Sequence, residues 1–130
     1  MQIAEDRGIV VDSIKQEEDR LYANFIYSIK TESTRKNHLK FLQYYMKFVG
    51  VQTLRELVAK PQKIIESDIK EYLVYLRNKK RISYGAAVLY LSAIKKFYYV
   101  NSDYQFKWDL KSSPWRNLYY QFRLWQLIIS

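Results

Sequence analysis

The chain has 130 residues, of which 48% are hydrophobic, and it carries a formal net charge of +9. This length has room for one domain with one core, and the apolar content favours a folded chain over a disordered one. The sequence contains no cysteine and a single histidine, His38. Disulfides and thiolate zinc sites are therefore excluded, and we expect neither a metal ion nor another cofactor. Three glycines and two prolines are few turn-formers for a β-sandwich, so the composition favours long helices.

Two further classes of protein are disfavoured. Residues 1–6 have neither the basic nor the apolar region of a secretory signal. The longest uncharged, apolar-leaning run, residues 82–94, is shorter than the roughly 20 residues that a bilayer needs. We therefore expect no membrane span and a cytoplasmic protein.

The positive charge is concentrated in the middle of the chain. Residues 1–32 hold four basic against seven acidic side chains, residues 33–100 fourteen against four, and residues 101–130 four against two. A concentrated basic segment is what a polyanion-binding surface requires, because each neutralised phosphate releases condensed counterions. The alternative is a basic protein whose charge serves only its solubility.

The first predicted helix begins at Ser13, because Ser13 and Gln16 have the spacing of a capping box. Apolar residues then recur at helical intervals, and the helix is expected to end near Lys30. Ser33 offers the next N-cap, so a second helix is predicted over residues 34–49, with Gly50 as its stop. One face of this helix is apolar: Leu39, Leu42, Met46 and Val49. Another is polar and basic: Lys36, Lys40, Gln43 and Lys47.

Three more helices follow. Thr53 and Glu56 form a second capping box, which opens a short helix that Pro61 must end. Ser67 is expected to cap a helix that finishes in the basic run 77–81, and Ser83 a last helix that stops near Asn101. Their apolar faces are Ile69, Tyr72, Leu73 and Leu76 in the first, and Ala87, Leu91, Ile94 and Tyr98 in the second. The predicted fold is therefore all-α, a compact bundle of four main helices plus one short helix.

The chain divides into three parts. We expect residues 1–17 to form an N-terminal arm and the start of the first helix, residues 18–104 the helical domain, and residues 105–130 an aromatic-rich linker or tail. Within the tail, Ser112-Ser113-Pro114 precedes an apolar stretch, residues 115–129, in which only two side chains are charged. That stretch is either an amphipathic helix that docks on the bundle or a partner, or an accidental C-terminus such as out-of-frame translation.

Little in the sequence indicates an enzyme. It has no glycine-rich phosphate loop, no dinucleotide fingerprint, and no serine with a local signature that pairs it with a base. The acidic side chains at positions 17–19 are interpreted as a solvated helix face, and His38 as a surface or DNA-facing residue.

DNA binding has better support. The first turn of the second helix presents hydroxyl, cationic and amide side chains beside backbone N–H groups, a set that suits phosphates and base edges. These side chains are Thr34, Arg35, Lys36, Asn37 and His38. A second basic cluster lies at residues 77–83, and Lys95 and Lys96 extend the polar side of the last helix. Alternatively, Lys79, Lys80 and Arg81 only favour a helix C-terminus through its dipole.

Two stretches resemble the core-binding, SAM-like domain of tyrosine recombinases and phage-type integrases. Residues 33–48 are similar to the family's "S-x-x-T…Y…L…F" helix. Residues 64–73 are similar to the family's "I-x-x-D-I-x-x-Y-L". Residues 83–98 are similar to the pattern that follows it, "S-x-x-T-x-x-x-x-L-S-A-L-K-x-F-Y". The end of this pattern reads here Leu91-Ser92-Ala93-Ile94-Lys95-Lys96-Phe97-Tyr98. The resemblance covers residues 18–104. One departure is Tyr84-Gly85-Ala86-Ala87, which lacks the threonine hydroxyl and the arginine cation of the family's "S-x-T-x-x-R".

The resemblance implies one half of a C-shaped clamp around duplex DNA, with strand cleavage in a separate C-terminal domain that this sequence does not contain. We therefore expect no catalysis from the chain itself. The expected partners are duplex DNA and either a recombinase catalytic domain or other protomers, with no small-molecule ligand. The positions that match the family's DNA-facing elements, together with three basic neighbours, are Thr34, Arg35, Lys36, His38, Lys40, Lys79, Lys80, Arg81, Ser83, Tyr84 and Lys95. The alternatives are a protein–protein interaction module that docks through residues 115–129, and a membrane-surface protein.

Overall fold

The computed structural model describes residues 2–104, and the side chains of residues 12–104. This part of the chain contains helices and no strand. The helices are α1 (Gln2–Tyr27), α2 (Glu32–Val49), α3 (Leu54–Ala59), α4 (Gln62–Asn78) and α5 (Tyr84–Asn101). The predicted all-α fold of four main helices and one short helix is confirmed. The predicted tail, residues 105–130, lies outside the described residues.

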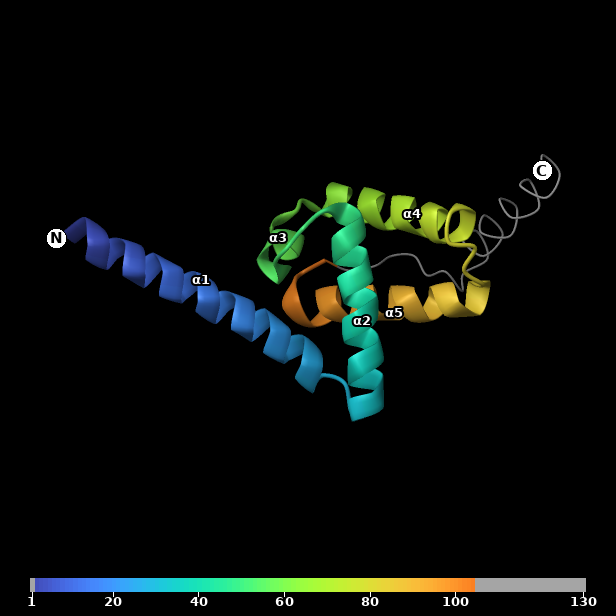
Figure 1. The fold of residues 1–130 in the computed structure, drawn as a ribbon, viewed down its shortest axis with the longest axis horizontal. Helices are drawn as coiled ribbons and strands as arrows, with labels where there is room; N and C mark the ends of the chain where they lie inside the picture. Colours follow the sequence, from blue (N-terminus) through green and yellow to red (C-terminus); the bar gives the residue numbers. More distant parts are fainter. Residues whose placement is uncertain (1, 105–130) are drawn as a thin grey trace.

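Helix α2 is the central element of the bundle. It crosses α4 and α5, which run in opposite directions, and contacts both (Figure 1). Helix α1 contacts α5 and α3, and its N-terminal part extends beyond the other helices. The α1–α5 contact includes an edge-to-face pair of Phe25 and Phe97, with ring centroids 6.0 Å apart. None of the described helices is long and apolar enough to cross a membrane.

Tyrosines form an unusual share of the core. Tyr45, Tyr72 and Tyr98 are among the largest fully buried side chains. The Tyr98 hydroxyl donates a hydrogen bond to the carbonyl oxygen of Leu57 at 3.2 Å and so joins α5 to α3. Burial raises the pKa of all three phenols well above the ordinary value. These tyrosines therefore act as neutral core residues, because forming the phenolate would place a charge in an apolar environment.

Two predicted helix starts are wrong because the helices begin earlier. Ser13 lies inside α1, since the preceding residues contain no proline and only one glycine to interrupt a helix. Ser67 lies inside α4, whose N-cap is Pro61. Proline fixes φ at a value that suits a helix start and needs no hydrogen bond there, so Pro61 both ends one helix and opens the next.

A third predicted cap is displaced by two residues. Thr31 caps α2 in place of Ser33: its Oγ1 accepts a hydrogen bond from the Thr34 N–H at 3.2 Å. The other predicted caps are confirmed. Gly50 ends α2 in the left-handed region at φ 79°, Thr53 and Glu56 form the capping box of α3, and Ser83 caps α5.

The predicted apolar faces of α4 and α5 are confirmed, because every residue expected on them is buried. On α2 the prediction is partly right: Leu42 is buried, whereas Leu39, Met46 and Val49 are half-buried. The fully buried Tyr45 was not expected on that face. The predicted polar face of α2 is exposed throughout.

Candidate nucleic-acid interface

The crossing helices α2 and α5 are rich in cations and nearly free of carboxylates. Together they contain one acidic residue, Glu32, in the first turn of α2. Their basic residues are Arg35, Lys36, Lys40, Lys47, Lys95 and Lys96. This helix pair therefore has a strong excess of positive charge, as a phosphate-binding surface requires.

The first turns of α2 expose three of the predicted DNA-binding residues, Thr34, Lys36 and Lys40. Lys36 and Lys40 are one turn apart on the same face. The Thr31 hydroxyl donates a hydrogen bond to the Thr34 hydroxyl at 2.7 Å, and the Thr34 N–H donates to the Thr31 hydroxyl oxygen. The Thr34 N–H is thus already used in capping, and Lys36 and Lys40 are the exposed cations of this segment.

Arg35 has a structural contact that the sequence did not indicate. Its Nε–H is shared by the carbonyl oxygens of Ile26, at 3.1 Å, and Ile29, at 2.7 Å. The guanidinium also lies 6.0 Å from the ring centroid of Tyr27. Helix α1 has no basic residue in its last turn, so Arg35 supplies the cation that a helix C-terminus favours.

His38 lies half-buried beside α5. Burial lowers its pKa below the ordinary value, against the raising effect of the Thr34 backbone, and the positive charge of Lys96 lowers it further. The imidazole is therefore neutral at physiological pH. The effect of Lys96 on His38 indicates that this cation of α5 lies near the N-terminal half of α2.

The turn between α4 and α5 exposes Lys79, Lys80 and Arg81. The N–H groups of Lys79 and Lys80 both donate to the carbonyl oxygen of Tyr75, at 2.9 and 3.2 Å. Arg81 has a φ of 53°, in the left-handed region that usually favours glycine. Three cations thus crowd the C-terminus of α4, where they complement the helix dipole and also remain accessible to a phosphate.

Arg77 does not belong to this exposed cluster, although the sequence placed it there. It is buried, and its Nε–H donates to Asn78 Oδ1 at 3.0 Å. Arg77 follows Leu73 by one turn, so the helical period directs it to the core side of α4.

The remaining predicted residues lie along α5. The Ser83 hydroxyl accepts a hydrogen bond from the Ala86 N–H at 3.2 Å, so it caps the helix. Tyr84 and Lys95 are half-buried. Tyr84 and Lys95 are separated by about 16 Å along the helix axis. The α4–α5 turn and the N-terminal half of α2 therefore form two separate basic segments. The first lies at the start of α5 and the second beside its later part (Figure 1).

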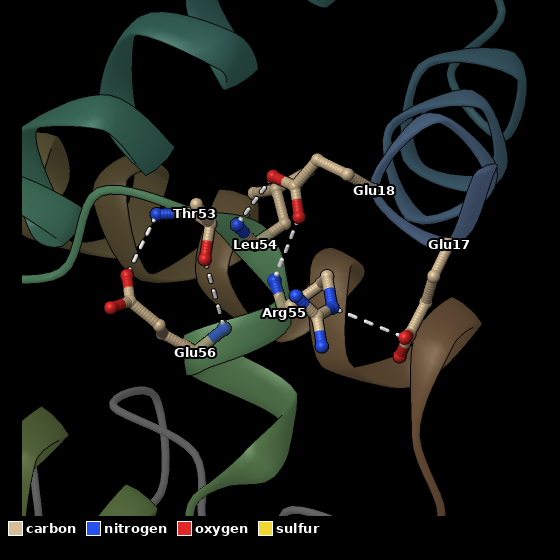
Figure 2. Close-up of polar contacts among 6 residues, drawn as sticks. All are labelled: Glu17, Glu18, Thr53, Leu54, Arg55 and Glu56. Carbon is tan, nitrogen blue, oxygen red and sulfur yellow. Dashed lines mark hydrogen bonds and ion pairs between the residues drawn. The ribbon is translucent and has the colours of Figure 1, made fainter. Parts of the chain in front are cut away.

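Two acidic residues of α1 make contacts that were not predicted from the sequence. Figure 2 shows Glu18 of α1 reaching the start of α3, where its carboxylate accepts hydrogen bonds from the N–H groups of Leu54, at 2.6 Å, and Arg55, at 3.0 Å. Glu17 pairs with Arg55 Nε at 3.1 Å. The interpretation of positions 17 and 18 as a solvated face is therefore wrong, whereas Asp19 is exposed.

Comparison with known proteins identifies one family. Residues 19–104 match the family described as phage integrase, N-terminal SAM-like domain. No curated protein and no solved structure matches the chain. The matched range includes α2–α5 entirely, and therefore both basic segments.

Proposed function

The chain belongs to the phage integrase N-terminal SAM-like domain family, and from this premise we propose that it binds duplex DNA as a non-catalytic module of a site-specific recombinase. The observation that carries this function is the charge of the α2–α5 pair, which has six cations and one carboxylate within the matched range. Proteins hold duplex DNA mainly through phosphate contacts, which need such a surface.

The two basic segments have different parts in this binding. Lys36 and Lys40 neutralise phosphates beside α2, and Lys95 adds a further cation on α5. At the α4–α5 turn, Lys79, Lys80 and Arg81 contact phosphates of a second stretch of the DNA backbone. Polar contacts come from four residues near these cations in the sequence: Thr34, His38, Ser83 and Tyr84. Because most contacts go to phosphates, we expect only a modest preference for DNA sequence. Arg35 supports binding by fixing the start of α2 against α1.

Strand cleavage belongs to a recombinase catalytic domain or other protomers, and not to the residues described above. A duplex-bound module would be found with the nucleoid in the cytoplasm. A single small module with few phosphate contacts binds weakly, with a Kd on the order of 10⁻⁴–10⁻⁶ M at physiological salt if it is non-specific.

Fluorescence anisotropy of a labelled duplex, titrated with the protein at several salt concentrations, tests this function. We expect saturable binding that weakens steeply as salt rises, with a log–log slope of about −0.9 for each phosphate neutralised. Competition with unlabelled duplexes of different sequence then measures specificity. No binding even at low salt would overturn the function and favour a protein partner for residues 115–129.

A further inference from the structure

A cluster of aromatic side chains lies on the basic α2–α5 pair. Phe41 of α2 stacks on Tyr90 of α5, with ring centroids 4.3 Å apart and an angle of 26° between the rings. Tyr44 of α2 lies against the same Tyr90 ring at 6.2 Å. We call these three residues the α2–α5 aromatic face. Phe41 and Tyr90 are half-buried, whereas Tyr44 is 44% exposed. The Tyr44 ring is therefore accessible and lies against two rings that pack on the bundle.

Cations flank the accessible ring on both sides. Lys40 and Lys47 precede and follow Tyr44 by about one helical turn, and both are exposed. Residues at this spacing lie on the same helix surface. The Lys40 ammonium lies 5.9 Å from the Tyr44 ring centroid. No carboxylate follows Glu32 on α2, and none lies on α5. Within the helix pair α2 and α5, the neighbours of the ring therefore include cations and no carboxylate, and the carboxylates of Glu18 and Asp19 on α1 line a pocket with Lys47.

An exposed ring between two cations matches the chemistry of an unpaired nucleotide. Single strands bind to surfaces that combine backbone-tracking cations with aromatic rings on which bases stack. A base inside a duplex already stacks on its two neighbours and cannot present its face to Tyr44. A duplex can still accept a hydrogen bond from the Tyr44 hydroxyl through a phosphate oxygen.

We propose that the α2–α5 aromatic face binds unpaired nucleotides of single-stranded DNA, with a base stacked on Tyr44 and the adjacent phosphates held by Lys40 and Lys47. Phe41 and Tyr90 position the Tyr44 ring. Single-strand binding goes beyond the proposed duplex function and rests on it only through the shared cations.

The test compares three labelled oligonucleotides of the same length at the same salt: oligothymidylate, an abasic strand and a duplex. We expect the protein to bind oligothymidylate more tightly than the abasic strand, which keeps the phosphates and lacks the bases. Tyr44→Ala should weaken oligothymidylate binding roughly 5- to 150-fold, the range for losing one stacked base. Tyr44→Phe should retain it, because stacking needs the ring and not the hydroxyl.

Tyr99→Ala is the matched control, because Tyr99 is a 78% exposed tyrosine outside the cluster. It should bind all three probes as the unaltered chain does, and circular dichroism should show each variant folded. Equal affinity for oligothymidylate and the abasic strand, or unchanged oligothymidylate binding by Tyr44→Ala, would overturn the inference. Equal losses in Tyr44→Ala and Tyr44→Phe would also overturn it, in favour of a hydroxyl–phosphate contact.

The two proposals fail separately. If the protein binds the duplex but not oligothymidylate, only the single-strand proposal is contradicted. If it binds oligothymidylate but not the duplex, only the proposed function is contradicted.

Discussion

The Nε of Arg35 lies 2.7 Å from the carbonyl oxygen of Ile29, just beyond the end of α1. A residue at the end of the first turn of α2 thus donates to a backbone carbonyl of the preceding loop, and it also donates to the Ile26 carbonyl within α1. These contacts fix the direction of α2 relative to α1. Because α2 carries Lys36 and Lys40, Arg35 supports the proposed interface by fixing the helix that presents these two lysines.

Replacing Arg35 with Ala should lower the free energy of unfolding by about 1–2 kcal/mol, because two carbonyl oxygens lose a charged hydrogen-bond donor. Urea denaturation measures this change. Lys36→Ala is the matched control: Lys36 is exposed, and its loss should change stability by less than about 0.5 kcal/mol. If the two variants are equally stable, the Arg35 contacts do not stabilise the junction.

Glu18→Ala should lower the free energy of unfolding by about 1–2 kcal/mol, because the start of α3 loses the carboxylate that accepts its Leu54 and Arg55 N–H groups. Thermal or urea unfolding checks the value. The neighbouring Asp19 is exposed, so Asp19→Ala should be close to neutral. An equal loss in the two variants would indicate a general effect of negative charge on α1 in place of a cap.

Replacing Lys79, Lys80 and Arg81 together with Ala should weaken duplex binding and flatten its salt dependence while leaving the fold intact. The log–log slope should become shallower by about 0.9 for each phosphate that the variant no longer neutralises. A control triple variant of Lys15, Arg20 and Lys63, all exposed, removes the same charge elsewhere. Unchanged binding by the turn variant would remove this segment from the interface and leave the helix-dipole interpretation of its cations.

The lowered pKa of His38 predicts a pH dependence of stability. Because the folded chain disfavours the protonated imidazole, the unfolded chain binds more protons between the lowered pKa and the ordinary value of 6.5. The His38 contribution is therefore complete above pH 6.5 and is lost as the pH falls through this window. Urea midpoints at pH 7.5 and pH 5.5 should differ more for the unaltered chain than for His38→Gln. An equal difference would show that other groups cause the dependence.

Features that depend on neighbouring residues were predictable from the sequence. Gly50 ends α2 and Thr53 caps α3 because each acts on backbone within a few residues of itself. The starts of α1 and α4 were missed because a plausible serine cap, at Ser13 or Ser67, can also lie in a helix interior when nothing upstream stops the helix.

Contacts between distant elements could not be predicted in this way. Glu18 meets α3, and Phe41 meets Tyr90, only because the packed helices bring them together. Arg35 was grouped with the DNA-binding residues because its chemistry suits a phosphate equally well. Only the position of the end of α1 shows that its Nε–H is already used.

The most direct test of the central claim is a nuclear magnetic resonance titration of the ¹⁵N-labelled protein with a short duplex at low salt. Binding by the basic segments predicts that the largest amide shifts fall in residues 34–40, 79–84 and 95–96. Residues 62–71, in the first half of α4, should change little. Shifts concentrated on α1 or the first half of α4, or no shifts at all, would contradict duplex binding by the α2–α5 pair and the α4–α5 turn.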